Sequence, residues 1–189
     1  KDTRDSIVSA FISLAKQNPQ RSSFTMSEIA RQAGISRQAI YQKHFQNYDD
    51  IIKYIHEQTD QRIFQVFNNS CLRREENPIE CFANFAIPLV YENRNIIRSL
   101  FVTQADPGWK EFLRDTYSKW ILKNVHYNKE FDFSEDDMTY VVANMIITFI
   151  EAWIRKENPT PPEKFKKTFL LLTTISLRDY MILQEKDSE

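Results

Sequence analysis

The sequence predicts an all-α fold, and three observations support this. Only two glycines occur in 189 residues, and the Asn-Gly and Asp-Gly pairs of tight β-hairpins are absent. Hydrophobic residues make up 42% of the chain, enough for a packed core, and they recur at the spacing of one helical face. Capping residues followed three positions later by an acid mark the helix starts. We therefore expect long helices with short connections.

Nine helices are expected, and most have a recognisable start. Residues 3–17 form the first. Thr25 and Glu28 form a capping box for the second, Ser36 caps the third, and Asn47 opens the fourth. The other five are expected at 78–91, at 93–103, from position 107 through 121, at 134–156 and at 161–186.

The connection between the second and third helices contains one of the two glycines, Gly34. Glycine adopts the left-handed conformation that ends a helix at little cost. Ile35 would turn inward, and Ala30 is small enough for a close helix crossing. Two interpretations fit this pattern, a simple αα-hairpin and a DNA-binding helix-turn-helix. The short helices, the small Ala30, the Gly34 turn and the polar outward residues together favour the DNA-binding interpretation. The charge agrees mildly, because residues 1–48 carry seven Lys or Arg and three Asp or Glu in a chain of net charge −1.

The stretch FTMSEIARQAGISRQAIYQKHF resembles the TetR family of bacterial transcription regulators, with specific similarity over about residues 5–55. The resemblance implies a three-helix DNA-binding head at 1–47 and a six-helix regulatory and dimerisation body at 48–189. It also implies a cytoplasmic homodimer that binds double-stranded DNA at a palindromic operator and is released by a small-molecule effector. A repressor is the expected type. The alternative is a TetR-like co-activator or adaptor that acts mainly through a partner protein.

Two departures from the family pattern fall at the end of the third helix. Phe45 follows Tyr41 by four positions instead of three, so we expect a slightly extended helix. Tyr48 stands where the family commonly has a phosphate-binding lysine, and we expect its hydroxyl or backbone amide to contact a phosphate instead.

The residues expected to contact DNA lie at the start of the second helix and along the third. They are Thr25, Met26, Ser27, Ser36, Arg37, Gln38, Tyr41, Gln42, Lys43, His44 and Tyr48. Gln38 and Gln42 are one turn apart, and glutamine can bind an adenine edge with two hydrogen bonds. The alternative for all of these residues is an ordinary solvated helix face.

The body is expected to hold an effector pocket and a dimer interface. Aromatic residues of the middle helices would line the pocket: Phe82, Phe85, Trp109, Phe112, Tyr117 and Trp120. Core packing is the alternative for each of them. Asn84, Arg98 and Gln104 could anchor a ligand or lie at the surface. The interface is expected at Val142, Met145, Ile146, Phe149, Trp153, Phe169, Leu172 and Ile175, because their helices are apolar on several sides.

Other function classes find little support. The sequence has no glycine-rich phosphate loop and no GxSxG or HExxH motif, so we expect neither an enzyme nor a cofactor. Cys71 and Cys81 have no metal-ligand spacing and are expected to be reduced thiols, although pairing remains open. No secretory signal is visible, and the most apolar run, at 141–154, is too short to span a bilayer.

Overall fold

The computed structural model describes residues 2–42, 45–66, 68–69, 77–127 and 132–181. All secondary structure in these ranges is helical, which confirms the all-α prediction, and each expected helix has a counterpart. The elements are α1 (Thr3–Gln17), α2 (Met26–Ala33), α3 (Arg37–Tyr41), α4 (Tyr48–Val66), α6 (Pro78–Cys81), the π-helix η2 (Phe82–Ala86), α7 (Ile87–Glu92), α8 (Arg94–Val102), α9 (Trp109–Asn124), α10 (Glu135–Ile154), α11 (Pro162–Thr174) and α12 (Leu177–Tyr180).

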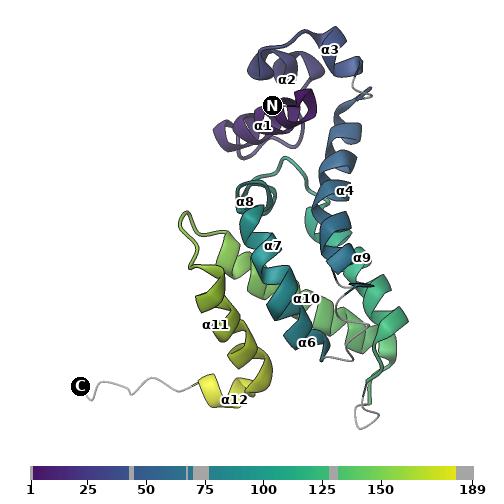
Figure 1. The fold of residues 1–189 in the computed structure, drawn as a ribbon, viewed down its shortest axis with the longest axis vertical. Coiled ribbons are helices and arrows are strands. Elements are labelled where there is room, and N and C mark those ends of the chain that lie inside the picture. Colours follow the sequence, from purple (N-terminus) through teal and green to yellow (C-terminus); the bar gives the residue numbers. More distant parts are fainter. Residues whose placement is uncertain (1, 43–44, 67, 70–76, 128–131, 182–189) are drawn as a thin grey trace, which may run out of the picture.

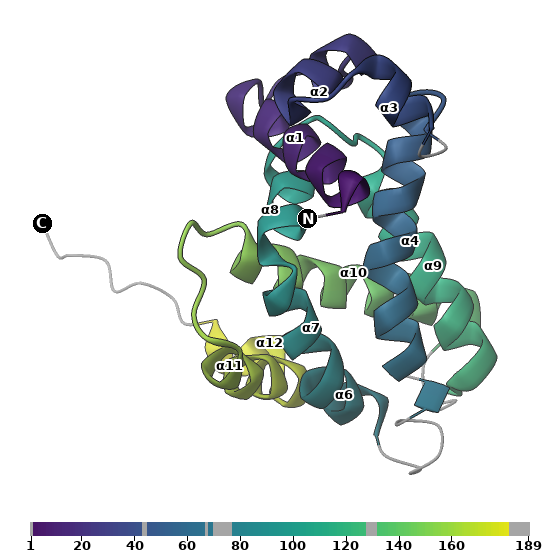
Figure 2. The same cartoon turned by 45° about the horizontal axis from the view of Figure 1, so that its top comes forward.

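Helices α1, α2 and α3 gather at one end of the molecule and form the head (Figure 1). The long helix α4 leaves the head and runs down one side of the body next to α9, as both views show (Figures 1 and 2). Helix α10 crosses the body and packs on α9 and α8, while α11 packs on α7 and η2. Buried side chains of head and body belong to one hydrophobic cluster, so the two parts share a packed boundary.

The expected helix at 78–91 is observed as α6, η2 and α7 in direct succession. The π-helical turn at Phe82–Ala86 immediately precedes the turn that contains Pro88. Proline has no N–H to donate to the preceding turn, and a wider turn is one way in which a helix accommodates this loss. The sequence therefore gives the right helix but misses its local change of pitch.

The last expected helix, 161–186, is shorter than expected. Helix α11 ends at Thr174, where Ile175 is extended, and α12 begins after Ser176. The hydroxyls of Thr173 and Thr174 bond to carbonyls of the preceding turn, and the Ser176 hydroxyl donates to the carboxylate of Asp179. Such side-chain bonds compete with the helical backbone, which explains the break. Residues 182–186 lie outside the described ranges.

Helix α10 is the central helix of the body. Of the described helices it alone, over its full length Glu135–Ile154, is long and apolar enough to cross a membrane by length and composition. Its first turn, however, carries three acids, and one face packs in the protein core. The buried residues of that face are Thr139, Ala143, Ile147, Ile150, Trp153 and Ile154. This burial is typical of the core helix of a globular domain.

Candidate DNA-binding surface and ligand cavity

The turn between α2 and α3 has the geometry of a helix-turn-helix connection. Gly34 is left-handed, with φ 68°, and the N–H of Ile35 donates to the carbonyl of Ala30 at 3.0 Å. A Cβ at Gly34 would meet no atom within 4 Å, so backbone conformation rather than space demands glycine here. Ser36 then caps α3 by accepting the N–H of Ala39 at 3.1 Å. These two features orient α3 on the head.

The start of α2 is held by a network around Glu28. Its carboxylate accepts the N–H of Thr25 at 2.8 Å and pairs with Arg21 at 2.7 Å, while the Thr25 hydroxyl accepts the N–H of Glu28. The expected capping box is thereby confirmed. The Arg21 guanidinium, followed by the Thr25 bonds, lowers the pKa of Glu28 from 4.5 to about 2.

This lowered pKa gives the head a specific acid sensitivity. Because the folded pKa of Glu28 lies below its unfolded value, its stabilisation is complete above pH 4.5 and is lost as the pH falls towards 2. We expect a Glu28→Gln variant to melt below the wild type at pH 6 and the difference to shrink below about pH 4. Melting curves of both proteins across this range check the expectation. Glu157→Gln, in the exposed turn after α10, is the control, and a gap independent of pH would contradict the assignment.

The residues expected to contact DNA mostly lie on the outer surface of the head. Those from α2 and its cap are Thr25, Met26 and Ser27, and those from α3 and its ends are Ser36, Arg37, Gln38, Tyr41 and Gln42. All are exposed except Met26 and Tyr41, which are half-buried. Arg37 donates to the Tyr41 hydroxyl at 3.0 Å, so these two side chains form one polar unit. Lys43 and His44 lie outside the described residues.

The expected extension of the third helix is wrong. Helix α3 ends at Tyr41, and Phe45 lies beyond it in a non-helical segment. Phe45 is nonetheless buried, with its ring 5.3 Å from that of Tyr54 on α4. Burial of the ring against α4 therefore places Phe45, and continuation of the helix is not needed.

The Tyr48 hydroxyl has a different role from the expected phosphate contact. It donates to the carbonyl of Ala105, in the loop between α8 and α9, at 2.6 Å. The ring packs near those of Phe11 and Phe24, with centroids 5.8 and 6.2 Å away. Burial, followed by the negative charge of Asp106, raises the pKa of Tyr48. The hydroxyl is therefore occupied inside the protein, and a phosphate contact by the backbone amide stays a prediction.

The loop at 103–108 connects the body to both α1 and α4, and we call it the junction loop. On the α1 side, the N–H of Gln104 donates to the carbonyl of Pro19 at 2.7 Å. On the α4 side, besides Tyr48, the Nε2 of His56 lies 2.5 Å from the carboxylate of Asp106, whose other oxygen accepts the Gly108 N–H. A shift of this loop would therefore act on the head at two points.

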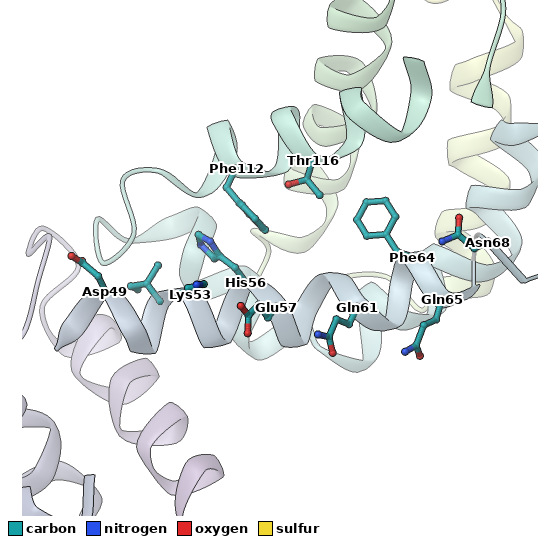
Figure 3. A pocket seen from close by; sticks show the side chains of 11 residues that line it. Asp49, Lys53, His56, Glu57, Gln61, Phe64, Gln65, Asn68, Phe112 and Thr116 are labelled. Carbon is teal, nitrogen blue, oxygen red and sulfur yellow. The ribbon is translucent and has the colours of Figure 1, made fainter. Parts of the chain in front are cut away.

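His56 also faces a broad groove between α4 and α9, shown in Figure 3. The groove has a volume of about 870 Å³ and carries Phe64, Phe112 and Thr116 on its walls. Phe112 stacks on the His56 ring at 3.9 Å, and the figure shows it reaching from α9 towards α4. Phe112, expected in a ligand pocket, thus lies in this groove.

A separate cavity of about 320 Å³ lies where η2, α9 and α10 meet, and we call it the body cavity. Its lining residues are Asn77, Pro78, Ile79, Phe82, Tyr117, Trp120, Ile121, Val125, His126, Tyr127, Val142, Ala143, Ile146 and Ile147. Three expected ligand residues, Phe82, Tyr117 and Trp120, are among them, whereas Phe85 is not. Trp109 lines a small void of about 30 Å³ deeper in the body.

Sequence reasoning missed the junction loop and most of the aliphatic cavity wall. A pairing of His56 with Asp106 spans 50 positions, and no spacing rule connects them. Of the possible polar anchors, Arg98 is already engaged, because its Nε donates to the carbonyls of Arg155 and Lys156 at the end of α10. Asn84 and the Gln104 side chain are exposed.

The residues expected at a dimer interface have different environments. Trp153 and Phe169 are buried within the chain, so they cannot face a partner. Val142 and Ile146 line the body cavity, Phe149 packs on Phe169, and Leu172 and Ile175 are half-buried. Met145 is exposed. It belongs to an exposed stripe on α10, formed by Val141, Met145, Thr148 and Ala152, which we call the α10 stripe.

Cys81 is disulfide-bonded and fully buried, which corrects the expectation of a reduced thiol at this position, and Cys71 lies outside the described residues. Within those residues, no group of three or more His, Cys, Asp or Glu side chains is placed to hold a metal ion.

No protein-family model matches the sequence, and no curated protein sequence is significantly similar to it. Solved structures do match. The dihydroxyacetone kinase operon activator DhaS is 20% identical with a TM-score of 0.56, and the match covers 90% of this chain and 93% of DhaS. NalD, the secondary repressor of the MexAB-OprM efflux pump in Pseudomonas aeruginosa, is 16% identical with a TM-score of 0.60 over 90% and 94% of the two chains. A TetR transcriptional regulator from Streptococcus agalactiae is 20% identical with a TM-score of 0.57 over 90% and 92%. The chain therefore has the TetR-type fold.

Proposed function

We propose that this chain is a DNA-binding transcriptional regulator that binds a palindromic operator as a homodimer and is released by a small-molecule effector. The observation that carries the proposal is the surface of α3. Its apolar residue Ile40 is fully buried, while Arg37, Gln38 and Gln42 are exposed on a helix that a glycine turn and a serine cap hold in place. A short exposed polar helix after such a turn suits the major groove.

A homodimer is proposed because a palindromic site requires two heads related by a twofold axis. The α10 stripe offers a surface for this pairing. Its members follow one another at steps of four, three and four residues, the spacing of a helix-packing seam, and they are exposed in the single chain.

Release by an effector is supported by the connection between cavity and head. Trp109 begins α9 directly after the junction loop, and its ring centroid lies 5.5 Å from that of His56. A molecule that shifts this end of α9 would move Asp106 and Ala105, to which α4 is bonded. The free energy by which such a molecule weakens operator binding cannot exceed the difference between its binding free energies for the two head positions.

We favour repression, since a dimer bound at an operator can block polymerase without any further surface. The structural relatives include one protein described as an activator and one as a repressor. A reporter gene placed behind the operator, with and without the protein, distinguishes the two directions.

Binding of the purified protein to DNA flanking its own gene, at several salt concentrations, tests the proposal. We expect a Gln38→Ala variant to bind the specific site about 5- to 150-fold more weakly, with little change on unrelated DNA. If Arg37 contacts a phosphate, the Arg37→Ala variant should show a smaller dependence on salt. The slope of the logarithm of the binding constant against the logarithm of the salt concentration should fall by about one in magnitude. Gln65→Ala, an exposed glutamine on α4, is the control. Equally weak binding to all DNA, unchanged in the Gln38→Ala variant, would contradict the proposal. It would favour an adaptor that a partner protein recruits to its site.

A further inference from the structure

The described residues that line the body cavity are mostly apolar. Among the described lining residues, His126 is the only His, Lys, Arg, Asp or Glu. Its side chain is 90% exposed, and its Nδ1 lies 3.5 Å from a carboxylate oxygen of Glu135. A charged ligand that lost its hydration against these described walls would gain no counter-charge from their apolar side chains.

Three polar groups of the described lining are already bonded within the protein. The Tyr127 hydroxyl bonds to that of Thr139 at 3.1 Å, the Trp120 Nε1 donates to Asn68, and the Asn77 side-chain oxygen accepts the N–H of Ile79. Most of the remaining described lining is aromatic and aliphatic carbon, from residues such as Phe82 and Ile146.

Behind this cavity lies the void of about 30 Å³, and the two hollows share four lining residues: Phe82, Tyr117, Ile146 and Ile147. Trp109 lines the void and is 1% exposed. Within the described part of the chain, its Nε1–H is the buried side-chain polar group that has no hydrogen-bond partner. Buried donors are nearly always paired, and an unpaired one is costly.

We infer that the body cavity binds a neutral, largely apolar molecule with one hydrogen-bond acceptor, and that this acceptor takes the Nε1–H of Trp109. The inference rests on the proposed function, because it names the class of molecule that would act as effector. It also explains how binding reaches the head. Trp109 adjoins the junction loop, and its ring lies next to His56 and Phe112.

Three related tricyclic compounds test the inference: fluorene, 9-fluorenone, which adds a carbonyl acceptor, and 9-fluorenone-4-carboxylate, which adds a charge. Quenching of the intrinsic tryptophan fluorescence gives their dissociation constants for the full chain without DNA. We expect fluorenone to bind about fivefold or more tightly than fluorene, and the carboxylate at least about 100-fold more weakly than fluorenone. In a Trp109→Phe variant, fluorene and fluorenone should bind alike.

Ile146→Phe, which fills the cavity wall, should weaken the binding of both neutral compounds. Thr116→Phe places the same side chain in the α4–α9 groove and should not affect them. Melting curves establish that each variant is folded.

An unchanged fluorenone preference in Trp109→Phe would show that water or another group satisfies the indole, and it would overturn the assigned acceptor contact. Tight binding of the carboxylate, loss of binding in Thr116→Phe alone, or no binding by any of the three compounds would overturn the inference. The operator assay uses no ligand, so a failure of the proposed function would be seen separately.

Discussion

A Met145→Glu variant should be monomeric at concentrations where the wild type is a dimer, and it should bind the operator at least about 100-fold more weakly. Met145 is 43% exposed at the middle of the α10 stripe, with Val141 one turn before it. If two copies pair along this stripe, the introduced carboxylate would be buried beside its symmetry mate. Two like charges without hydration or counter-charge would force the chains apart, and a single head retains only half of the operator contacts.

Sedimentation equilibrium gives the mass of the variant, and a titration of operator DNA gives its affinity. Tyr140→Glu is the matched control, because Tyr140 is 57% exposed on the same helix. It lies off the stripe, with its ring 5.9 Å from the Arg114 guanidinium of α9. We expect this control to stay dimeric. A Met145→Glu protein that remains dimeric and binds the operator with normal affinity would contradict a dimer interface on α10.

The head shows how much local sequence can predict. Thr25, Gly34 and Ser36 act within four residues of their own positions, so their capping roles follow from residue type and spacing. The helix boundaries of α1, α2 and α10 agree closely with expectation for the same reason.

The prediction fails where a side chain is placed by a partner on another structural element. Tyr48 has the position of a phosphate contact, but the carbonyl of Ala105, 57 residues away, accepts its hydroxyl. Phe45 is placed by Tyr54 rather than by its own helix, and Trp153 by residues of α11. An apolar residue on a many-sided apolar helix fits a core, a cavity or an interface equally well, and only tertiary packing decides between them. This explains why the eight expected interface residues have different environments, from the buried core and the cavity wall to the exposed surface.

Of the replacements proposed here, that of Trp153 should lower the free energy of unfolding the most. The ring stacks on Phe165 at 4.0 Å with an 8° interplanar angle, and its centroid lies 5.8 Å from that of the Tyr91 ring. Its Nε1 donates to the carbonyl of Thr160 at 2.8 Å, which fixes the connection between α10 and α11. The side chain thus joins three helices and the segment between two of them.

We expect Trp153→Ala to lower the free energy of unfolding by about 3–5 kcal/mol, because it removes a large buried ring and leaves a cavity. Trp153→Phe retains an aromatic ring against Phe165 but loses the hydrogen bond, so a loss of about 1–3 kcal/mol is expected. Urea unfolding at one fixed protein concentration measures both, since the stability of the proposed dimer would depend on concentration. Met181→Ala, at a side chain that is 71% exposed, should stay within about 0.5 kcal/mol of the wild type. If Trp153→Ala were no less stable than this control, the contacts of Trp153 could not be what holds α11 on the body. Other buried residues would then have to hold α10, and with it the α10 stripe, in place.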